Sequence, residues 1–300
     1  MSIQASEVGQ LAAGAVADIL DRATSGRSVA DYAETTPIAW SVIAEGGWDR
    51  IGIPESADGG GASLRDLAEV ALAWGQGCVA LPFLESTWAR RWSTAAREES
   101  GPISVSVKRS VPKAPSPQGE NRGGLAPYGA FPGVVLARSI GQGDDVFEPA
   151  PDGVGDPFAP SLCSSLVPWT SQISPEATLE LGVIWAAEAV GAAQHLLNLS
   201  VEYAKTREQF GKPIGSFQAV KHRLADMHSD VQYAETAVIW ASLEPDNSRR
   251  ATAYALDTAI EVAQSSIQVH GGMGFTWEMG LHFYLRTMLV RRQLVQGLWA

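Results

Sequence analysis

Three long helical stretches after residue 174 constrain the fold of this chain more than any other feature. Between residues 217 and 241, apolar side chains recur at spacings of three and four, the pattern of an amphipathic helix with one buried face. The members of this stripe are Phe217, Val220, Leu224, Met227, Val231, Ala234, Val238 and Ala241. The stretch 181–206 is apolar around much of its circumference, which predicts a buried helix, and 251–270 predicts a third that Gly271 and Gly272 end. With a fourth helix over 281–296, these stretches predict an up-and-down four-helix bundle joined by short turns.

The middle of the chain has a different character. Residues 101–170 contain eleven of the 17 prolines, and proline density of this kind excludes long helices. Short runs with β character remain at 103–107 and 133–140, and 114–124 is expected to be a flexible excursion. This zone therefore predicts an abbreviated β-domain or an ordered loop region.

The N-terminal zone is rich in alanine and again has helical periodicity. In the stretch 64–76, Leu64, Leu67, Ala71 and Trp74 fall on one face, and Ser63 is placed to cap the helix N-terminus. The predicted fold class is mainly α (α+β). Its three parts are an N-terminal helical domain over 1–100, the shortened β region over 101–170 and the bundle over 171–300.

Charge and length exclude several classes of protein. A formal net charge of −11 argues against nucleic-acid binding, which needs a basic footprint. No apolar run approaches the roughly 20 residues of a membrane helix, and the acidic N-terminus lacks the basic region of a signal peptide. Two cysteines, Cys78 and Cys163, make neither a disulfide framework nor a metal site. These features predict a cytoplasmic protein that binds no nucleic acid, membrane or metal.

Basic residues nevertheless gather in two places. One group lies where the first two helices of the predicted bundle meet, over residues 205–223, and the other lies near the C-terminus. They are Lys205, Arg207, Lys212, Lys221, His222 and Arg223, followed by Arg286, Arg291 and Arg292. A basic area on an acidic protein suits a small anionic ligand such as a phosphate-bearing cofactor. The alternative is a solvated helix face paired with nearby acidic residues.

The segment "TREQFGKPIG" places a cation and an aromatic ring together where two helices meet. The first helix is expected to end near Gln209, with Arg207 in its last turn and Phe210 just beyond. A guanidinium can hold a pyrophosphate through several donors while an aromatic ring packs against a planar base. The alternative is that Arg207 only complements the negative end of the helix.

A second segment, "QVHGGMG", follows the third helix. Its paired glycines, Gly271 and Gly272, permit positive φ and let a ligand approach the backbone, and Gln268 offers a donor and an acceptor one turn earlier. Glycine is also routine as a helix C-cap, so this segment alone is a weak signal.

Taken together, the segments resemble the acyl-CoA dehydrogenase family. Its motifs look like "YAxxRxxFGxPI", "FQ…K…LADM" and "QxxGGxGxT", and all three are present here in that order. The stretch "GIPESADGGGASLRDLAEVALAWG" also resembles the "PEEYGG" loop of that family and the helix after it. The resemblance covers roughly 1–90 and 175–297, whereas the middle zone matches poorly.

The resemblance implies FAD as cofactor and an acyl-CoA thioester as substrate. In such enzymes one subunit cradles the isoalloxazine ring, and the bundle of the adjacent subunit holds the ADP part. This would place Arg207, Gln209 and Phe210 at the ADP part, with Gln268, Gly271 and Gly272 beside it.

The catalytic base that the resemblance implies is not evident. Many members carry a glutamate in a C-terminal "YEG", whose nearest counterpart here is "VQG" with Gln296, and an amide cannot accept the proton. Others carry it 22 residues before the tyrosine of "YA", which lands on Leu181, one residue after Glu180. Glu180 is therefore the candidate base, with Glu188 and Glu278 as further candidates. The alternative for Glu180 is a first-turn residue favoured by the helix dipole.

The missing base and the short middle zone point the same way. The chain resembles the shortened subunit of actinobacterial-type hetero-oligomeric acyl-CoA dehydrogenases, which pair it with a full-length subunit and often act on bulky, steroid-like thioesters. The implied assembly is a heterotetramer. Two alternatives stay open: a self-sufficient homo-oligomeric acyl-CoA dehydrogenase, and a non-catalytic helical scaffold.

Overall fold

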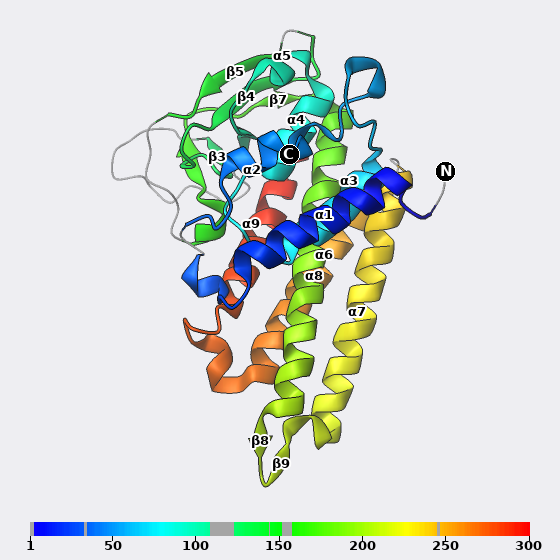
Figure 1. The fold of residues 1–300 in the computed structure, drawn as a ribbon, viewed down its shortest axis with the longest axis vertical. Helices are drawn as coiled ribbons and strands as arrows, with labels where there is room; N and C mark the ends of the chain where they lie inside the picture. Colours follow the sequence, from blue (N-terminus) through cyan, green and yellow to red (C-terminus); the bar gives the residue numbers. More distant parts are fainter. Residues whose placement is uncertain (1–2, 33–34, 109–122, 144, 152–157, 245–246) are drawn as a thin grey trace.

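The C-terminal part of the chain folds into the predicted up-and-down bundle, as the computed structural model shows (Figure 1). Its helices are α6 (Pro175–Thr206), α7 (Gln218–Leu243), α8 (Ser248–His270) and α9 (Leu281–Leu298). The structure describes residues 3–32, 35–108, 123–143, 145–151, 158–244 and 247–300. The predicted fold class, mainly α with a small β region, is confirmed.

Local sequence explains where these helices begin and end. Ser174 caps α6 by accepting a hydrogen bond from the Ala177 amide, and Pro175 occupies the first turn, where its missing N–H costs nothing. The predicted stripe of α7 is buried from Met227 to Ala241. Helix α8 stops at Gly271, whose φ of 59° is open to glycine but strained for other residues.

The N-terminal part is helical, as predicted. Its helices are α1 (Glu7–Thr24), α2 (Trp40–Glu45), α3 (Leu64–Gly75), α4 (Phe83–Trp92) and α5 (Thr94–Glu98). Ser63 caps α3 in a reciprocal capping box with Asp66, as its position in the sequence indicated. The Asp66 carboxylate also accepts a 2.7 Å hydrogen bond from the Ser6 amide at the start of α1. One side chain thus fixes the first turns of two helices.

The middle part forms two small sheets beside α4 and α9. The strands of the first sheet are β1 (Ile103–Val105), β4 (Val135–Ile140), β5 (Val146–Pro149) and β7 (Gln172–Ile173). Strands β1 and β7 pair with β4 in parallel, and β5 pairs with it antiparallel. The second sheet joins β2 (Val107–Lys108), β3 (Gly124–Ala126) and β6 (Ser165–Val167) antiparallel. Both predicted β runs are strands, and most of the predicted excursion at 114–124 lies outside the described residues.

Helices α3 and α6 cross with their backbones in direct contact. A methyl group at Gly75 would overlap the carbonyl oxygen of Glu188, and one at Gly191 would overlap the carbonyl oxygen of Leu72. Glycine at both positions is therefore required for this crossing, which presses the N-terminal part onto the bundle.

One hydrophobic core runs through all three parts. It includes Val16 of α1, Ile103 of β1, Trp185 of α6 and Leu294 of α9, each almost completely buried. Because the packing is continuous, it does not mark the predicted boundaries near residues 100 and 170, which stay predictions. Among the described residues, no helix combines the length and hydropathy that crossing a membrane would require.

Candidate functional site

A two-stranded hairpin projects from the free end of the bundle, between α6 and α7 (Figure 1). Strands β8 (Glu208–Gln209) and β9 (Lys212–Pro213) pair antiparallel. The expectation that the helix continues to near Gln209 was wrong, because α6 ends at Thr206 and Arg207 follows as its C-cap. Pro213 restricts the residue before it to extended backbone, which favours the strand over another helical turn.

Phe210 occupies an unusual position in this hairpin. Its φ is 54° and that of Gly211 is 78°, so both central residues of the two-residue loop are left-handed. Such loops match the twist of the strands but favour asparagine, aspartate or glycine. An aromatic residue there costs on the order of 1–2 kcal/mol. The Phe210 side chain is 92% exposed and has the Phe217 ring as an edge-to-face neighbour, with centroids 6.0 Å apart. Strain at an exposed ring points to a contact outside this chain.

Arg207, at the base of the hairpin, presents an unpaired cation. Its side chain is exposed and, in the part of the chain that the structure describes, makes no hydrogen bond or ion pair. By contrast, Lys205 forms an ion pair of 2.6 Å with Glu202. Gln209 is also exposed, and its amide nitrogen donates to the Glu208 carbonyl. The guanidinium is therefore available to an anion.

The glycine segment lies at the same end of the bundle. Helix α8 leads into the short turn Gly271–Phe275, and the Tyr203 ring of α6 stacks on the His270 ring with centroids 4.3 Å apart. Apart from neighbouring residues in the same turn, no atom of the described part of the chain lies within 4 Å of where a Cβ would stand on Gly271 or Gly272, so their backbone is open. Gln268 is exposed one turn earlier. The structure thus brings the two predicted motifs to one end of the bundle.

Glu180 lies near the opposite end of α6. Its carboxylate accepts hydrogen bonds from Arg91 Nε at 2.9 Å and from Trp92 Nε1 at 2.7 Å. These contacts tie α6 to α4, which is a structural use of the side chain. Its role as a catalytic base stays a prediction.

A buried ionic cluster joins all three parts of the chain. Arg291 of α9, 1% exposed, lies 2.7 Å from Glu85 of α4 and 2.7 Å from Glu188 of α6. It also donates to the Tyr128 hydroxyl of the β region, and Trp185 Nε1 donates to Glu85. One guanidinium therefore connects the N-terminal helices, the β region and the bundle.

The sequence reading of Arg291 as part of a basic area was wrong, because this residue is buried and already paired. Its neighbour Arg292 is partly exposed and pairs with Asp257 at 3.1 Å. A periodicity argument could have found the difference, since Arg291 follows the buried residues Tyr284 and Met288 at spacings of seven and three along α9.

Burial and the opposite charges compete in setting the pKa values of the cluster. Burial raises the pKa of Glu188, and the Arg291 guanidinium opposes this shift only in part. Burial alone would lower the pKa of Arg291, but Glu188 and Glu85 reverse the effect and raise it. Arg291 is therefore permanently charged between two carboxylates.

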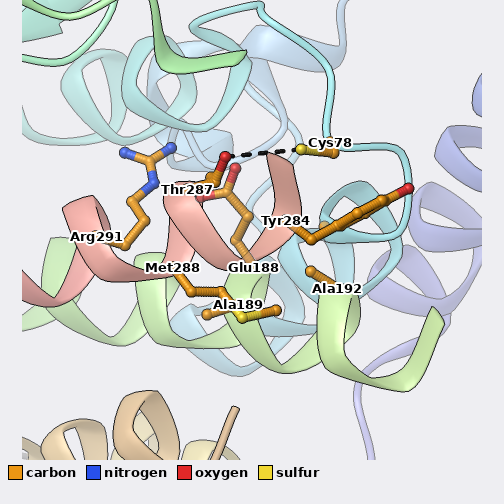
Figure 2. A pocket seen from close by; sticks show the side chains of 9 residues that line it. Cys78, Glu188, Ala189, Ala192, Tyr284, Thr287, Met288 and Arg291 are labelled. Atoms are coloured by element: carbon orange, nitrogen blue, oxygen red, sulfur yellow. Dashed lines mark hydrogen bonds and ion pairs between the residues drawn. The ribbon is translucent and has the colours of Figure 1, made fainter. Parts of the chain in front are cut away.

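A small pocket lies beside the cluster, between α3, α6 and α9 (Figure 2). Tyr284, Thr287 and Arg291 line it from α9, together with Glu188 of α6 and Cys78, which follows α3. The Cys78 sulfur lies 3.7 Å from Thr287 Oγ1. The pocket has room for about one water molecule. As it stands, it does not accommodate an acyl chain.

The comparisons with known proteins identify the class. Residues 182–294 match the family model described as "Acyl-CoA dehydrogenase, C-terminal domain". The chain is 33% identical to acyl-CoA dehydrogenase IpdE2 of Mycobacterium tuberculosis, over 86% of this chain and 82% of that protein. The chain therefore belongs to the acyl-CoA dehydrogenase family, flavoprotein oxidoreductases that act on the CH–CH group of acyl-CoA thioesters.

Solved structures with the same fold include two-chain complexes. The ChsE4–ChsE5 complex of Mycobacterium tuberculosis matches with a TM-score of 0.73 and 22% identity, covering 100% of this chain and 96% of the matched one. A structure titled "Tcur3481-Tcur3483 steroid ACAD G363A variant" has a TM-score of 0.73 and 18% identity, covering 95% and 92%. The family predicted from the motifs is thus confirmed, and these two structures share the fold of this chain.

The family implies FAD. The hairpin β8–β9 with Arg207 and the turn at Gly271 and Gly272 form one end of the bundle, here called the bundle tip, and their side chains and backbone fit the nucleotide half of FAD. The pyrophosphate needs donors without competing carboxylates, which the unpaired Arg207 provides. The adenine needs an apolar flat surface, which the exposed Phe210 ring provides. The open backbone at Gly271 and Gly272 lets a phosphate or sugar approach closely.

Proposed function

We propose that this chain is the shortened subunit of a hetero-oligomeric acyl-CoA dehydrogenase and that its bundle tip completes a flavin site seated in a full-length partner. The observation that carries the proposal is the hairpin, which has an unpaired cation, Arg207, at its base and a strained, exposed aromatic ring, Phe210, three residues later in its loop. Among the described residues, the Arg207 side chain has no partner, and the Phe210 ring has only the edge-to-face neighbour Phe217, which leaves it 92% exposed.

Each tip residue has a distinct task in this proposal. Arg207 binds the pyrophosphate, Phe210 packs against the adenine, and Gln209 and Gln268 hydrogen-bond the ribose or base edges. Gly271 and Gly272 keep the backbone open for close approach. The bound flavin supplies the hydride acceptor for α,β-desaturation.

The partner supplies the catalytic base. Glu180 is occupied by Arg91 and Trp92, Glu188 is held by Arg291 beside a pocket of water size, and Gln296 cannot accept a proton. Each of these observations supports an arrangement in which this chain binds and orients the cofactor and a residue of the partner subunit removes the proton from the substrate.

The proposed substrate is a bulky acyl-CoA thioester, with a steroid-derived acyl group as the first to test. The reason is the structural neighbour titled a steroid acyl-CoA dehydrogenase. The proposed assembly is a heterotetramer of two such chains and two full-length subunits, in line with the two-chain complexes among the neighbours.

The test is the visible spectrum of the chain purified alone and after co-expression with a full-length family member. We expect bound oxidised flavin only in the complex. Arg207→Ala should lower flavin occupancy, whereas Lys205→Ala, which removes an exposed cation two residues away that is already paired with Glu202, should leave it unchanged. Equal occupancy in both variants would contradict the proposal.

The same experiment separates the alternatives. Flavin in the single chain, with activity lost in Glu180→Gln, would favour a self-sufficient homo-oligomer. Flavin in neither preparation would favour a scaffold.

A further inference from the structure

Helices α6 and α8 meet along a polar seam just above the bundle tip. The hydroxyls of Ser200 and Ser266, both completely buried, are 2.8 Å apart, and the Ser266 hydroxyl also donates to the Leu196 carbonyl of α6. Buried hydroxyls are costly to leave unpaired, by about 1–3 kcal/mol each. The seam therefore favours one register of α6 against α8 over any other.

An aromatic pair lies next to these two hydroxyls, one helical turn nearer the bundle tip. The rings of Tyr203 and His270 stack at 4.3 Å with an interplanar angle of 27°. His270 Nδ1 lies 2.8 Å from the Ser266 carbonyl, so the same serine that pairs with α6 also orients the imidazole. The imidazole is 3% exposed, and burial lowers its pKa, which keeps it neutral and able to stack.

The pair is coupled directly to both halves of the proposed nucleotide site. The Arg207 amide donates to the Tyr203 carbonyl at 2.8 Å, and His270 is the residue immediately before Gly271. Any sliding or rotation of α6 against α8 would therefore change the separation between the guanidinium and the glycine backbone. A slip of one helical turn would change it by about 5.4 Å, more than the span of a hydrogen bond.

We infer that the Tyr203–His270 pair, held by the Ser200–Ser266 contact, is a positioning device that fixes the spacing between Arg207 and the Gly271–Gly272 backbone. This inference rests on the proposed function of the tip. Tyr203 and His270 act through the residues that follow them and need not touch the cofactor.

The chain offers a matched control. His195 and Tyr284 form a second stacked pair, with centroids 5.4 Å apart and the same interplanar angle of 27°, between α6 and α9 and away from the tip. Removing the His195 ring should disturb the bundle in a similar way without changing the spacing at the tip.

The first measurement is independent of the cofactor. Spin labels at Glu208→Cys and Met273→Cys, two exposed positions in the hairpin and the glycine turn, report the distance between the two halves in the complex with the full-length subunit. We expect a single narrow distance distribution, broadened by His270→Ala and kept by His270→Phe, which retains a ring. His195→Ala should keep it narrow. A narrow distribution in His270→Ala would overturn the inference.

The second measurement titrates FAD into the flavin-depleted complex. Loss of an aromatic pair predicts an increase in Kd of about threefold to tenfold for His270→Ala. His270→Phe and His195→Ala should stay within about twofold of the unmodified complex. If His270→Ala broadens the distance distribution but leaves the Kd unchanged, the positioning role is refuted. If Arg207→Ala also leaves the Kd unchanged, the proposed function fails with it.

Discussion

Replacing Arg291 by methionine tests whether the buried cluster holds the three parts of the chain together. Methionine is of similar length and apolar, so the change removes the charge without leaving a large cavity. Glu85 and Glu188 are then left buried, 0% and 7% exposed, with no cation between them. Removing one partner of a buried ion pair costs about 3–5 kcal/mol.

A second estimate gives a similar value. A buried carboxylate that has lost its cation can be protonated and so avoid carrying an unpaired charge. At pH 7 this protonation costs about 3.7 kcal/mol for a glutamate whose pKa in the unfolded chain is near 4.3. We therefore expect Arg291→Met to lower the free energy of unfolding by about 4 kcal/mol at pH 7. At roughly 2 °C per kcal/mol for a chain of this size, Tm should fall by about 8 °C.

The pH dependence distinguishes this mechanism from a simple packing defect. The cost of protonating a carboxylate falls by about 1.4 kcal/mol for each unit that the pH is lowered, so the defect should shrink between pH 7 and pH 5.5. Urea unfolding at both pH values measures it. The triple variant Arg291→Met, Glu85→Gln and Glu188→Gln removes the stranded charges and should recover most of the loss. A loss below 1 kcal/mol, or one that is the same at both pH values, would refute the reasoning.

Three further predictions follow from other described contacts. Asp66→Ala removes the acceptor for the backbone amides of Ser6 and Ser63, the N-cap residues of α1 and α3, and should cost about 1–3 kcal/mol. Although burial raises the pKa of Asp66, the hydrogen bonds from Ser63 and Ser6 outweigh it and lower the pKa. This contribution is therefore present at neutral pH and lost as the pH falls through the folded pKa, which acid titration of both proteins would reveal. Phe210→Asn relieves the left-handed strain and should raise Tm slightly while reducing flavin occupancy of the complex; a fall in Tm would contradict the strain. Burial raises the pKa of Cys78 to about 11 and that of Cys163 to about 12, so neither thiol should react with Ellman's reagent at pH 8 in the folded chain; rapid reaction of either would contradict this.

The sequence predicted the bundle because each of its helices carries a strong local signal. The apolar stripe of α7 and the glycines after α8 place a buried face and an end without reference to the rest of the chain. The hairpin β8–β9 could not be predicted in this way. Its turn holds phenylalanine where such turns favour asparagine, aspartate or glycine, so local preference pointed away from it.

The bundle tip and the Arg291 cluster also differ in how far apart their residues lie in the sequence. The tip residues could be proposed from the sequence because their motifs are contiguous, and the structure adds the exposure, the strain and the Tyr203–His270 contact. The Arg291 cluster was missed because its partners come from α4, α6 and the β region, up to 206 residues away. The periodicity of α9 can place Arg291 on the buried face, but only the folded chain reveals the carboxylates that neutralise its charge.

The contact between α3 and α6 at Gly75 and Gly191 has a consequence for how the chain opens. Helices whose backbones touch cannot separate gradually, because the first ångström of movement breaks the packing on both sides. Amides in α3 and the facing turns of α6 should therefore exchange their hydrogens through one shared unfolding event. A partner subunit would then meet these two helices as one preassembled body.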